Sequence, residues 1–167
     1  MADNTAPGLV LGRVVDVDDP EQRHRVKLQR LDRAVGIVTD WAQIVTPFAS
    51  NEAGTFFTPE VDDLAVLGFS GSRPYVLGFV YGGDAAPPAT EPGARRIQSV
   101  NGHAITLADN DADGITIADA HGNEVVMNAD GIALTSQGNI TITAQGDITI
   151  EASGTTTIKG ATVELNP

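Results

Sequence analysis

The 167-residue sequence predicts an all-β protein of two parts. The first is a small five-stranded barrel, and the second is a repeat whose apolar face can be buried only when three chains associate. Three observations lead to this prediction. Short segments rich in Val and Leu alternate with turn-forming segments in the first half of the chain. All aromatic residues lie between Trp41 and Tyr81. Glycines recur at Gly138, Gly146 and Gly154, and Ile and Thr alternate between them.

Composition excludes several classes of protein. The chain has no Cys, so disulfide bonds cannot stabilise it. No apolar run is long enough for a transmembrane helix, and the N-terminus lacks the pattern of a secretory signal, so we expect synthesis in the cytoplasm. The formal net charge of -12 disfavours nucleic acid as a partner, because affinity for phosphates rests on clustered Lys and Arg.

The barrel is predicted from five short strands without a convincing helix. Alternating or β-branched residues place these strands at 9–17, 26–31, 41–46, 65–69 and 75–81. The segment SGSRP forms the turn between the last two. The oligonucleotide/oligosaccharide-binding (OB) barrel is the commonest five-stranded solution, and an SH3-like barrel would give a similar pattern.

The segment GGDAAPPATEPG, residues 82–93, is rich in Pro and Gly and indicates an extended connection. The predicted organisation is an N-terminal tail at 1–8, the barrel domain at 9–82, a linker at 83–98, a transition at 99–129 and the repeat at 130–167.

Residue parity defines one apolar face in the repeat. From 139 to 159 even positions are small or apolar and odd positions are polar, which is the alternation of a strand with one buried face. Residues 130–137 belong to the same register through Ile132, Leu134 and Ser136. Upstream of Asp130, and again after Gly160, the apolar positions are odd, so turns or bulges are expected at both places. The residues expected in the buried face are Ile132, Leu134, Ile140, Ile142, Ala144, Ile148, Ile150, Ala152 and Ile158.

One chain is too short to close a solenoid over this face. A three-faced coil needs about three eight-residue segments, so a single chain completes little more than one coil, and repeat folds need several stacked units. Three chains, each supplying one face of a triangular prism, would bury the apolar positions and pair the strand edges.

The segments GRVVDVDDPEQRHRVKLQ, WAQIVTPFASNEAGTFFTPEVDDLAVLGF and RPYVLGFVYGG resemble the OB domain of the central spike proteins of contractile phage tails and type VI secretion systems, the VgrG-like family. This resemblance spans residues 12–83, with Asp62 at a position where the family usually has Gly. In the family an intertwined trimeric β-helix of octads follows the barrel. Residues 99–134 are similar to the transition into that β-helix, so the resemblance extends over 9–167.

The resemblance implies a structural protein: a homotrimeric needle beneath a baseplate hub that pierces a target cell envelope, within a phage tail, tailocin or related particle. The family's hub domains are absent from this sequence, so a separate hub protein is expected. The apolar end of the rod predicts docking of a small PAAR-type tip protein. The residues expected to contact it are Val163, Leu165, Asn166 and Pro167.

Three motifs have simpler explanations. DNDADG, residues 109–114, matches the first half of a calcium loop, but Ala120 occupies the position of the bidentate Glu, and a hairpin tip is the better interpretation. His103 and His121 are distant in the sequence, so only the fold could bring them together. GFSGS, residues 68–72, lacks the final Gly and the helix of a nucleophile elbow. We therefore expect no catalytic, metal or cofactor site.

The alternative is a binding module. An OB barrel with a trimerising β-helical tail could bind nucleic acid or glycan, although nucleic acid requires a basic groove with stacking aromatic residues. The negative charge makes this the second hypothesis.

Overall fold

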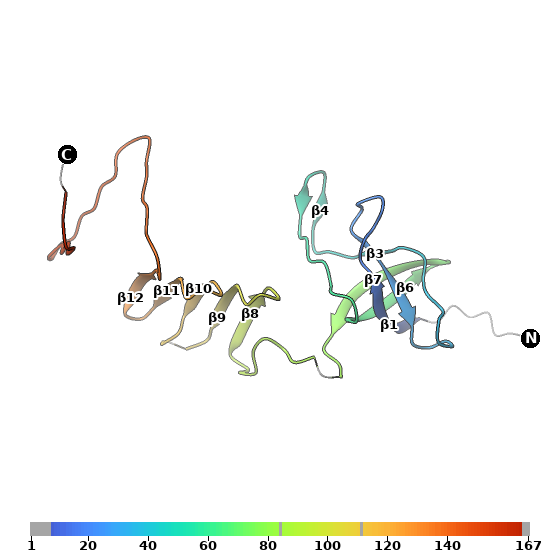
Figure 1. The fold of residues 1–167 in the computed structure, drawn as a ribbon. Coiled ribbons are helices and arrows are strands. Elements are labelled where there is room, and N and C mark those ends of the chain that lie inside the picture. The colour runs from blue at the N-terminus through green and yellow to red at the C-terminus, as the bar shows by residue number, and fades with distance from the viewer. Residues whose placement is uncertain (1–7, 84, 111, 165–167) are drawn as a thin grey trace, which may run out of the picture. The chain divides into compact units, whose positions relative to one another are not determined.

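The computed structural model describes residues 8–83, 85–110 and 112–164. Contacts within the chain divide it into two compact units, Met1–Thr90 and Glu91–Pro167. All regular elements of the described residues are β-strands (Figure 1), which confirms the predicted all-β class. Accordingly, that part of the chain contains no helix with the length and apolar character needed to span a membrane.

The first unit is a closed five-stranded barrel. Its strands are β1 (Leu9–Asp16), β2 (Arg25–Arg30), β3 (Ala42–Ile44), β6 (Leu64–Ser70) and β7 (Arg73–Val80), in the closed order β1-β2-β3-β7-β6. The strands pair antiparallel except β3 and β7, which are parallel. Each strand overlaps a predicted one, and the closed barrel is consistent with the expected OB fold.

A small hairpin interrupts the connection from β3 to β6. It consists of β4 (Ala49–Ser50) and β5 (Ala53–Gly54), joined by a turn in which Glu52 has a φ of 55°. The sequence did not predict this hairpin, because two-residue strands of small side chains carry no alternation.

Aliphatic side chains fill the barrel. Alternate residues of β1, β2, β6 and β7 point inward, and the fully buried set includes Val14, Val26, Leu28, Leu67 and Val76. The aromatic residues, although confined to this half of the chain, do not form the core. Phe69 packs against the aliphatic cluster, but the other four phenylalanines and Tyr81 are exposed.

The turn before β6 contains a backbone conformation that favours glycine. Asp62 has a φ of 78°, and its N–H donates to the carbonyl O of Val14 at 2.9 Å. The neighbouring Asp63 carboxylate accepts the N–H of Glu60 at 2.9 Å. This conformation explains why Gly suits the position in the sequences that the chain resembles.

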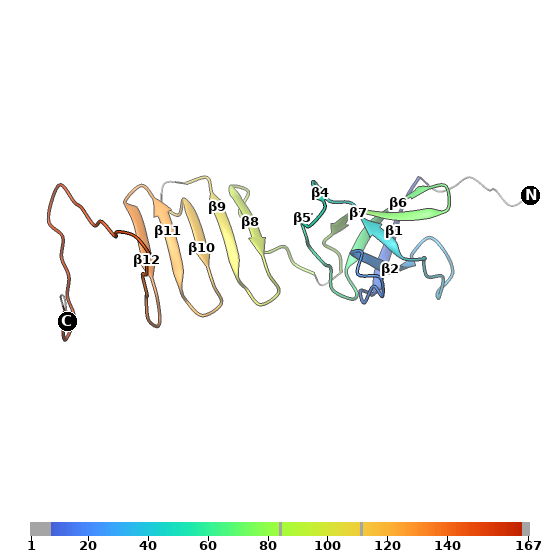
Figure 2. The same cartoon turned by 90° about the horizontal axis from the view of Figure 1, so that it is seen from above.

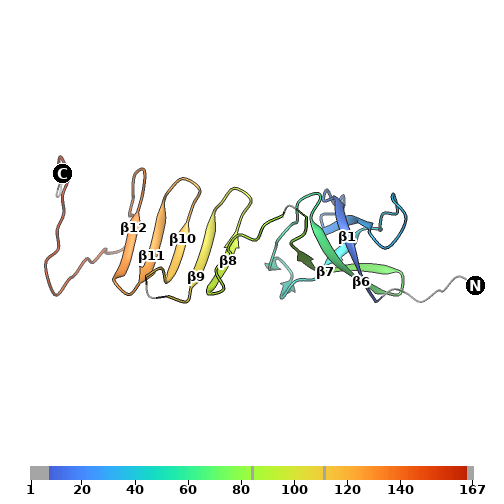
Figure 3. The same cartoon turned by 90° about the horizontal axis from the view of Figure 1, so that it is seen from below.

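The second unit contains a five-stranded antiparallel meander (Figures 2 and 3). Its strands are β8 (Ala94–Gln98), β9 (Ala104–Ala108), β10 (Ile115–Ala118), β11 (Glu124–Asn128) and β12 (Gly131–Thr135). The first of these strands lies inside the segment 83–98 that we expected to be a linker, because pairing with β9 recruits Ala94–Gln98 into the sheet.

The parity change near Asp130 is a tight hairpin. Asn128 pairs directly with Gly131, so only Ala129 and Asp130 form the loop, and odd positions of β11 face even positions of β12. Gly131 has a φ of 128°, which a side chain rarely adopts. The turn expected at this place is therefore present, and it keeps the apolar residues of β12 on the same face as those of β11.

The segment that follows β12 has no strand partner among the described residues. From 136 to 164 no residue lies in a strand, and Figure 1 shows this segment leaving the meander. In the described part of a single chain the expected octad β-helix is therefore not formed.

Candidate functional surfaces

One face of the meander is apolar except at Arg95 of the edge strand β8, which pairs with Leu107. Strand register aligns alternate residues into two rows, and the opposite face carries Thr106 and Thr116. The first row is Ile97, Ile105, Ile117, Val125 and Leu134, and the second is Leu107, Ile115, Met127 and Ile132. Seven of these nine residues are exposed, so the chain leaves a contiguous apolar face uncovered.

The residues predicted for the trimer core fall into two groups. Ile132 and Leu134 lie in the apolar rows and are 77% and 59% exposed. The others lie in the segment without strands, where they are all exposed and the single chain does not bring them together: Ile140, Ile142, Ala144, Ile148, Ile150, Ala152 and Ile158.

Of the residues predicted to contact a tip protein, only Val163 is described, and it is 47% exposed. Leu165, Asn166 and Pro167 lie outside the described residues, as do residues 1–7 of the expected tail.

The motif DNDADG forms the loop between β9 and β10, as predicted. The side chain of Asn110 accepts the N–H groups of Ala112 and Asp113, and Asp109 pairs with Arg95. Asp111 lies outside the described residues. Among the residues described, no three His, Cys, Asp or Glu side chains gather as metal ligands.

The fold does bring the two downstream histidines together. The rings of His103 and His121, from the turns before β9 and after β10, have centroids 6.0 Å apart. In the same turn Asp119 accepts three hydrogen bonds, from the Asn123 side chain at 2.7 Å and from the N–H groups of His121 and Asn123. The side-chain bond from Asn123 is the main cause that lowers the pKa of Asp119 to about 2.

The barrel carries a basic and aromatic surface on β2, β3 and β7, hereafter the barrel platform. Arg25 lies opposite Gln43, and Gln43 lies opposite Tyr75. When the same register is continued by two residues, forward from Arg25 and backward from Gln43 and Tyr75, it aligns Lys27, Trp41 and Arg73. The Lys27 Nζ lies 4.7 Å and the Arg25 Cζ 5.9 Å from the centre of a Trp41 ring, which are cation–π distances.

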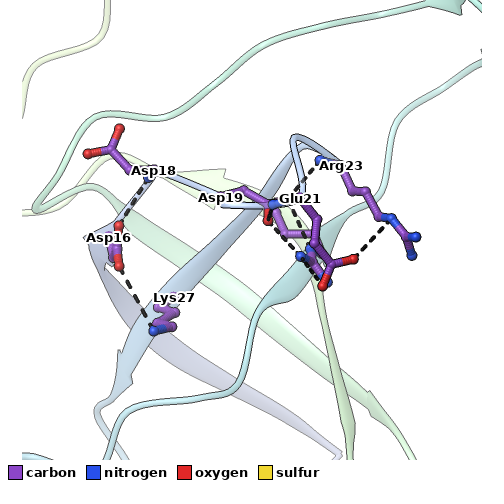
Figure 4. Close-up of polar contacts among 7 residues, drawn as sticks. Asp16, Asp18, Asp19, Glu21, Arg23 and Lys27 are labelled. Carbon is purple, nitrogen blue, oxygen red and sulfur yellow. Dashed lines mark hydrogen bonds and ion pairs between the residues drawn. The ribbon is translucent and has the colours of Figure 1, made fainter.

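Asp19 holds the loop beside the platform (Figure 4). Its carboxylate, whose side chain is only 5% exposed, accepts the Nε of Arg25 at 2.9 Å and the Nη2 at 2.6 Å. It also accepts the N–H groups of Glu21 and Arg23. The Arg25 hydrogen bonds hold the pKa of the Asp19 carboxyl well below its usual range. A single carboxylate thereby fixes the loop from β1 to β2.

Two grooves follow this surface. One of about 230 Å³ is lined by Arg23, Arg25, Trp41, Gln43, Arg73 and Pro74. A second groove, of about 560 Å³, shares Arg23 and Gln43 with the first and extends to Phe48 and Phe56 beside the β4–β5 hairpin. His24 stacks on Phe56 with ring centroids 4.2 Å apart. The platform is therefore concave and continues toward exposed aromatic rings.

The platform was not predicted, because the net charge of the whole chain conceals this local group of cations. A local signal is present in the three segments Arg25-Val-Lys27, Trp41-Ala-Gln43 and Arg73-Pro-Tyr75, each with cationic, aromatic or amide residues at alternate positions of a predicted strand or its start. In a barrel these positions face outward.

The first unit is similar to a known family of domains. Residues 10–81 match the family described as the type VI secretion system/phage-baseplate injector OB domain. The match covers the whole barrel and less than half of the 167 residues. The barrel is thus similar to the OB domains of baseplate injectors, which supports a structural role in a phage or secretion particle. No curated protein matches the chain.

Proposed function

We propose that the protein is the homotrimeric central spike of a contractile injection particle, a rigid needle beneath the baseplate hub that pierces the envelope of a target cell. The observation that carries the proposal is the uncovered apolar face of the meander, whose rows run through β12 toward the octad segment. The family match of the barrel supports a baseplate setting.

Three chains solve the problem that the uncovered face creates. An antiparallel sheet is stable in water when one face is packed and the other is polar. Here the opposite face is mixed, with Arg96, Thr106 and Thr116 in one row with Val126 and Ala133. The apolar rows of three copies would fill one shared interior. The octad segments continue the same alternation, and their strands pair between chains in the proposed prism.

The proposed needle has a partner at each end. The barrels join the trimer to a separate hub protein, and the C-terminal end carries a small PAAR-type tip protein. The exposed apolar side chain of Val163 supports the second contact. We assign the protein no enzymatic role: its function in this proposal is mechanical and rests on strand pairing between chains.

Analytical ultracentrifugation of the full chain in native buffer tests the proposal. The expected result is a single species with three times the mass of the chain. A folded monomer with the strands that the structure describes would falsify the spike hypothesis. Such a result would show that the chain is stable while its apolar face is exposed to water.

A further inference from the structure

We propose that the barrel platform binds an acidic oligosaccharide, with a sugar carboxylate or phosphate held at Arg73 and neighbouring sugar rings lying over Trp41, Gln43 and Tyr75. This inference goes beyond the spike function and does not depend on it. The chemistry of the platform and its position on the barrel both support it.

The position is the one that OB barrels use for ligands. In this fold, oligonucleotides and oligosaccharides bind across strands 2 and 3 and the loops that join strands 1 to 2 and 4 to 5. In this chain those elements are β2, β3, the loop held by Asp19, and the turn between β6 and β7. The 230 Å³ groove takes its lining from the loop, β2 and β3 through Arg23, Arg25 and Gln43, and from Arg73 at the start of β7, directly after the turn.

Arg73 is the cation best placed to receive an anion. Arg25 is committed to Asp19 at 2.6 Å and Glu21 at 3.3 Å, Arg23 lies 3.2 Å from Glu21, and Lys27 lies 4.0 Å from Asp16. Arg73 forms no ion pair with any residue in the described part of the chain. A planar guanidinium can bind a carboxylate or phosphate through two parallel hydrogen bonds.

The remaining groups suit a sugar. Gln43 is exposed between Arg25 and Tyr75, and its amide can donate to and accept from hydroxyl groups. Trp41 and Tyr75 are half-buried, and the cations of Lys27 and Arg25 lie over a Trp41 ring, so a sugar would contact the aromatic residues together with these side chains. Aromatic rings beside charged donors suit a ligand that carries both hydroxyl groups and an anionic group.

Charge favours an oligosaccharide over nucleic acid. Nucleic acid carries a charge at every nucleotide, which Asp16 at the end of β1, Asp18 and Glu21 in the following loop, and the net charge of -12 would repel. An oligosaccharide can place one anionic group at Arg73 and extend along the groove through neutral hydroxyl groups.

Trp41 is the only tryptophan, so its fluorescence reports on the platform directly. We would titrate the full chain with sialyllactose, a trisaccharide with a single carboxylate, with neutral maltotriose and with a short oligothymidylate. The expected result is a saturable change with sialyllactose that weakens as salt screens the charges, and weaker responses to the other two. A stronger response to oligothymidylate would overturn the assignment, and so would the absence of a saturable change with sialyllactose.

Matched variants separate a site from a general charge effect. Arg73→Gln should weaken binding about tenfold or more, because it removes a hydrogen bond to a charged group. Arg96→Gln makes the same charge change on β8 of the other unit and should leave binding unchanged. Equal losses in the two variants, with unaltered circular dichroism, would refute a site at Arg73.

Discussion

Single carboxylates organise the loops of both units. Asp19 accepts two guanidinium and two backbone donors in the barrel, and Asp119 accepts one amide and two backbone donors in the meander. The sequence places both residues in turns, and solvated loop carboxylates are the ordinary expectation there. Their partners were not predictable from spacing, because Arg25 reaches Asp19 only once β2 is paired.

Replacing Asn123 tests the hydrogen bonds of Asp119. In Asn123→Ala the side-chain donor is lost, so the pKa of Asp119 should rise from about 2 toward its ordinary value of 3.8. A lowered carboxyl pKa stabilises the fold above the unfolded value, and this contribution is lost as pH falls through the folded one. The variant should therefore be less stable than the parent above about pH 4. The difference should narrow toward pH 2 and then stay constant, because the variant also loses the hydrogen bonds that Asn123 Oδ1 accepts from the Ser136 hydroxyl and the Gln137 N–H.

Carboxyl NMR titration measures the pKa of Asp119 in both proteins, and urea unfolding at several pH values measures the stability. Asn139→Ala, in the segment outside the turn, is the control and should leave the titration unchanged. An unshifted Asp119 in the Asn123 variant would show that the amide bond is not the main cause.

At the scale of elements, alternation predicted the strands that bury one face. β1, β2, β6 and β7 were found because inward Val and Leu residues alternate with other types. β8 was not, because Ala-Arg-Arg-Ile-Gln shows no such pattern and becomes a strand by pairing with β9. The octad segment has the clearest alternation and yet no strand in the single chain, since alternation cannot supply a partner edge.

In the turn before β6, glycine substitutions at two adjacent positions should change the stability of the barrel in opposite directions. Asp62→Gly should stabilise the barrel by up to about 1 kcal/mol, because glycine relieves the positive φ while the N–H bond to Val14 remains. Asp63→Gly should destabilise it by about 1 kcal/mol, because the Glu60 N–H loses its acceptor.

Urea unfolding followed by circular dichroism measures both changes. The pair shares a charge change and a loss of side chain, so a common electrostatic effect would move both in one direction. A loss of stability in Asp62→Gly would contradict the strain argument.

For the whole molecule, the central question is whether the even positions of the octads are buried between chains. Ile142→Asp should destabilise the proposed trimer by roughly 3 kcal/mol or more, because it places a carboxylate in an apolar interior. Thr141→Asp adds the same charge at the neighbouring odd position, which faces water in the prism, and should have little effect.

Sedimentation velocity over a dilution series compares the two variants. Dissociation of the Ile142 variant alone is the expected outcome. Equal behaviour of the two would mean that parity does not separate an inside from an outside, and the prism would have to be abandoned.

The two units also differ in how far apart their paired strands lie in the chain. In the meander every strand pairs with the next one, whereas the barrel closes only when β1 meets β6 and β3 meets β7. Local pairings form faster than distant ones, because a long loop must be closed before a distant contact is made. The meander can therefore present its apolar rows within each chain soon after synthesis. In the proposed trimer, the time before the three copies meet would be the period of greatest risk of aggregation.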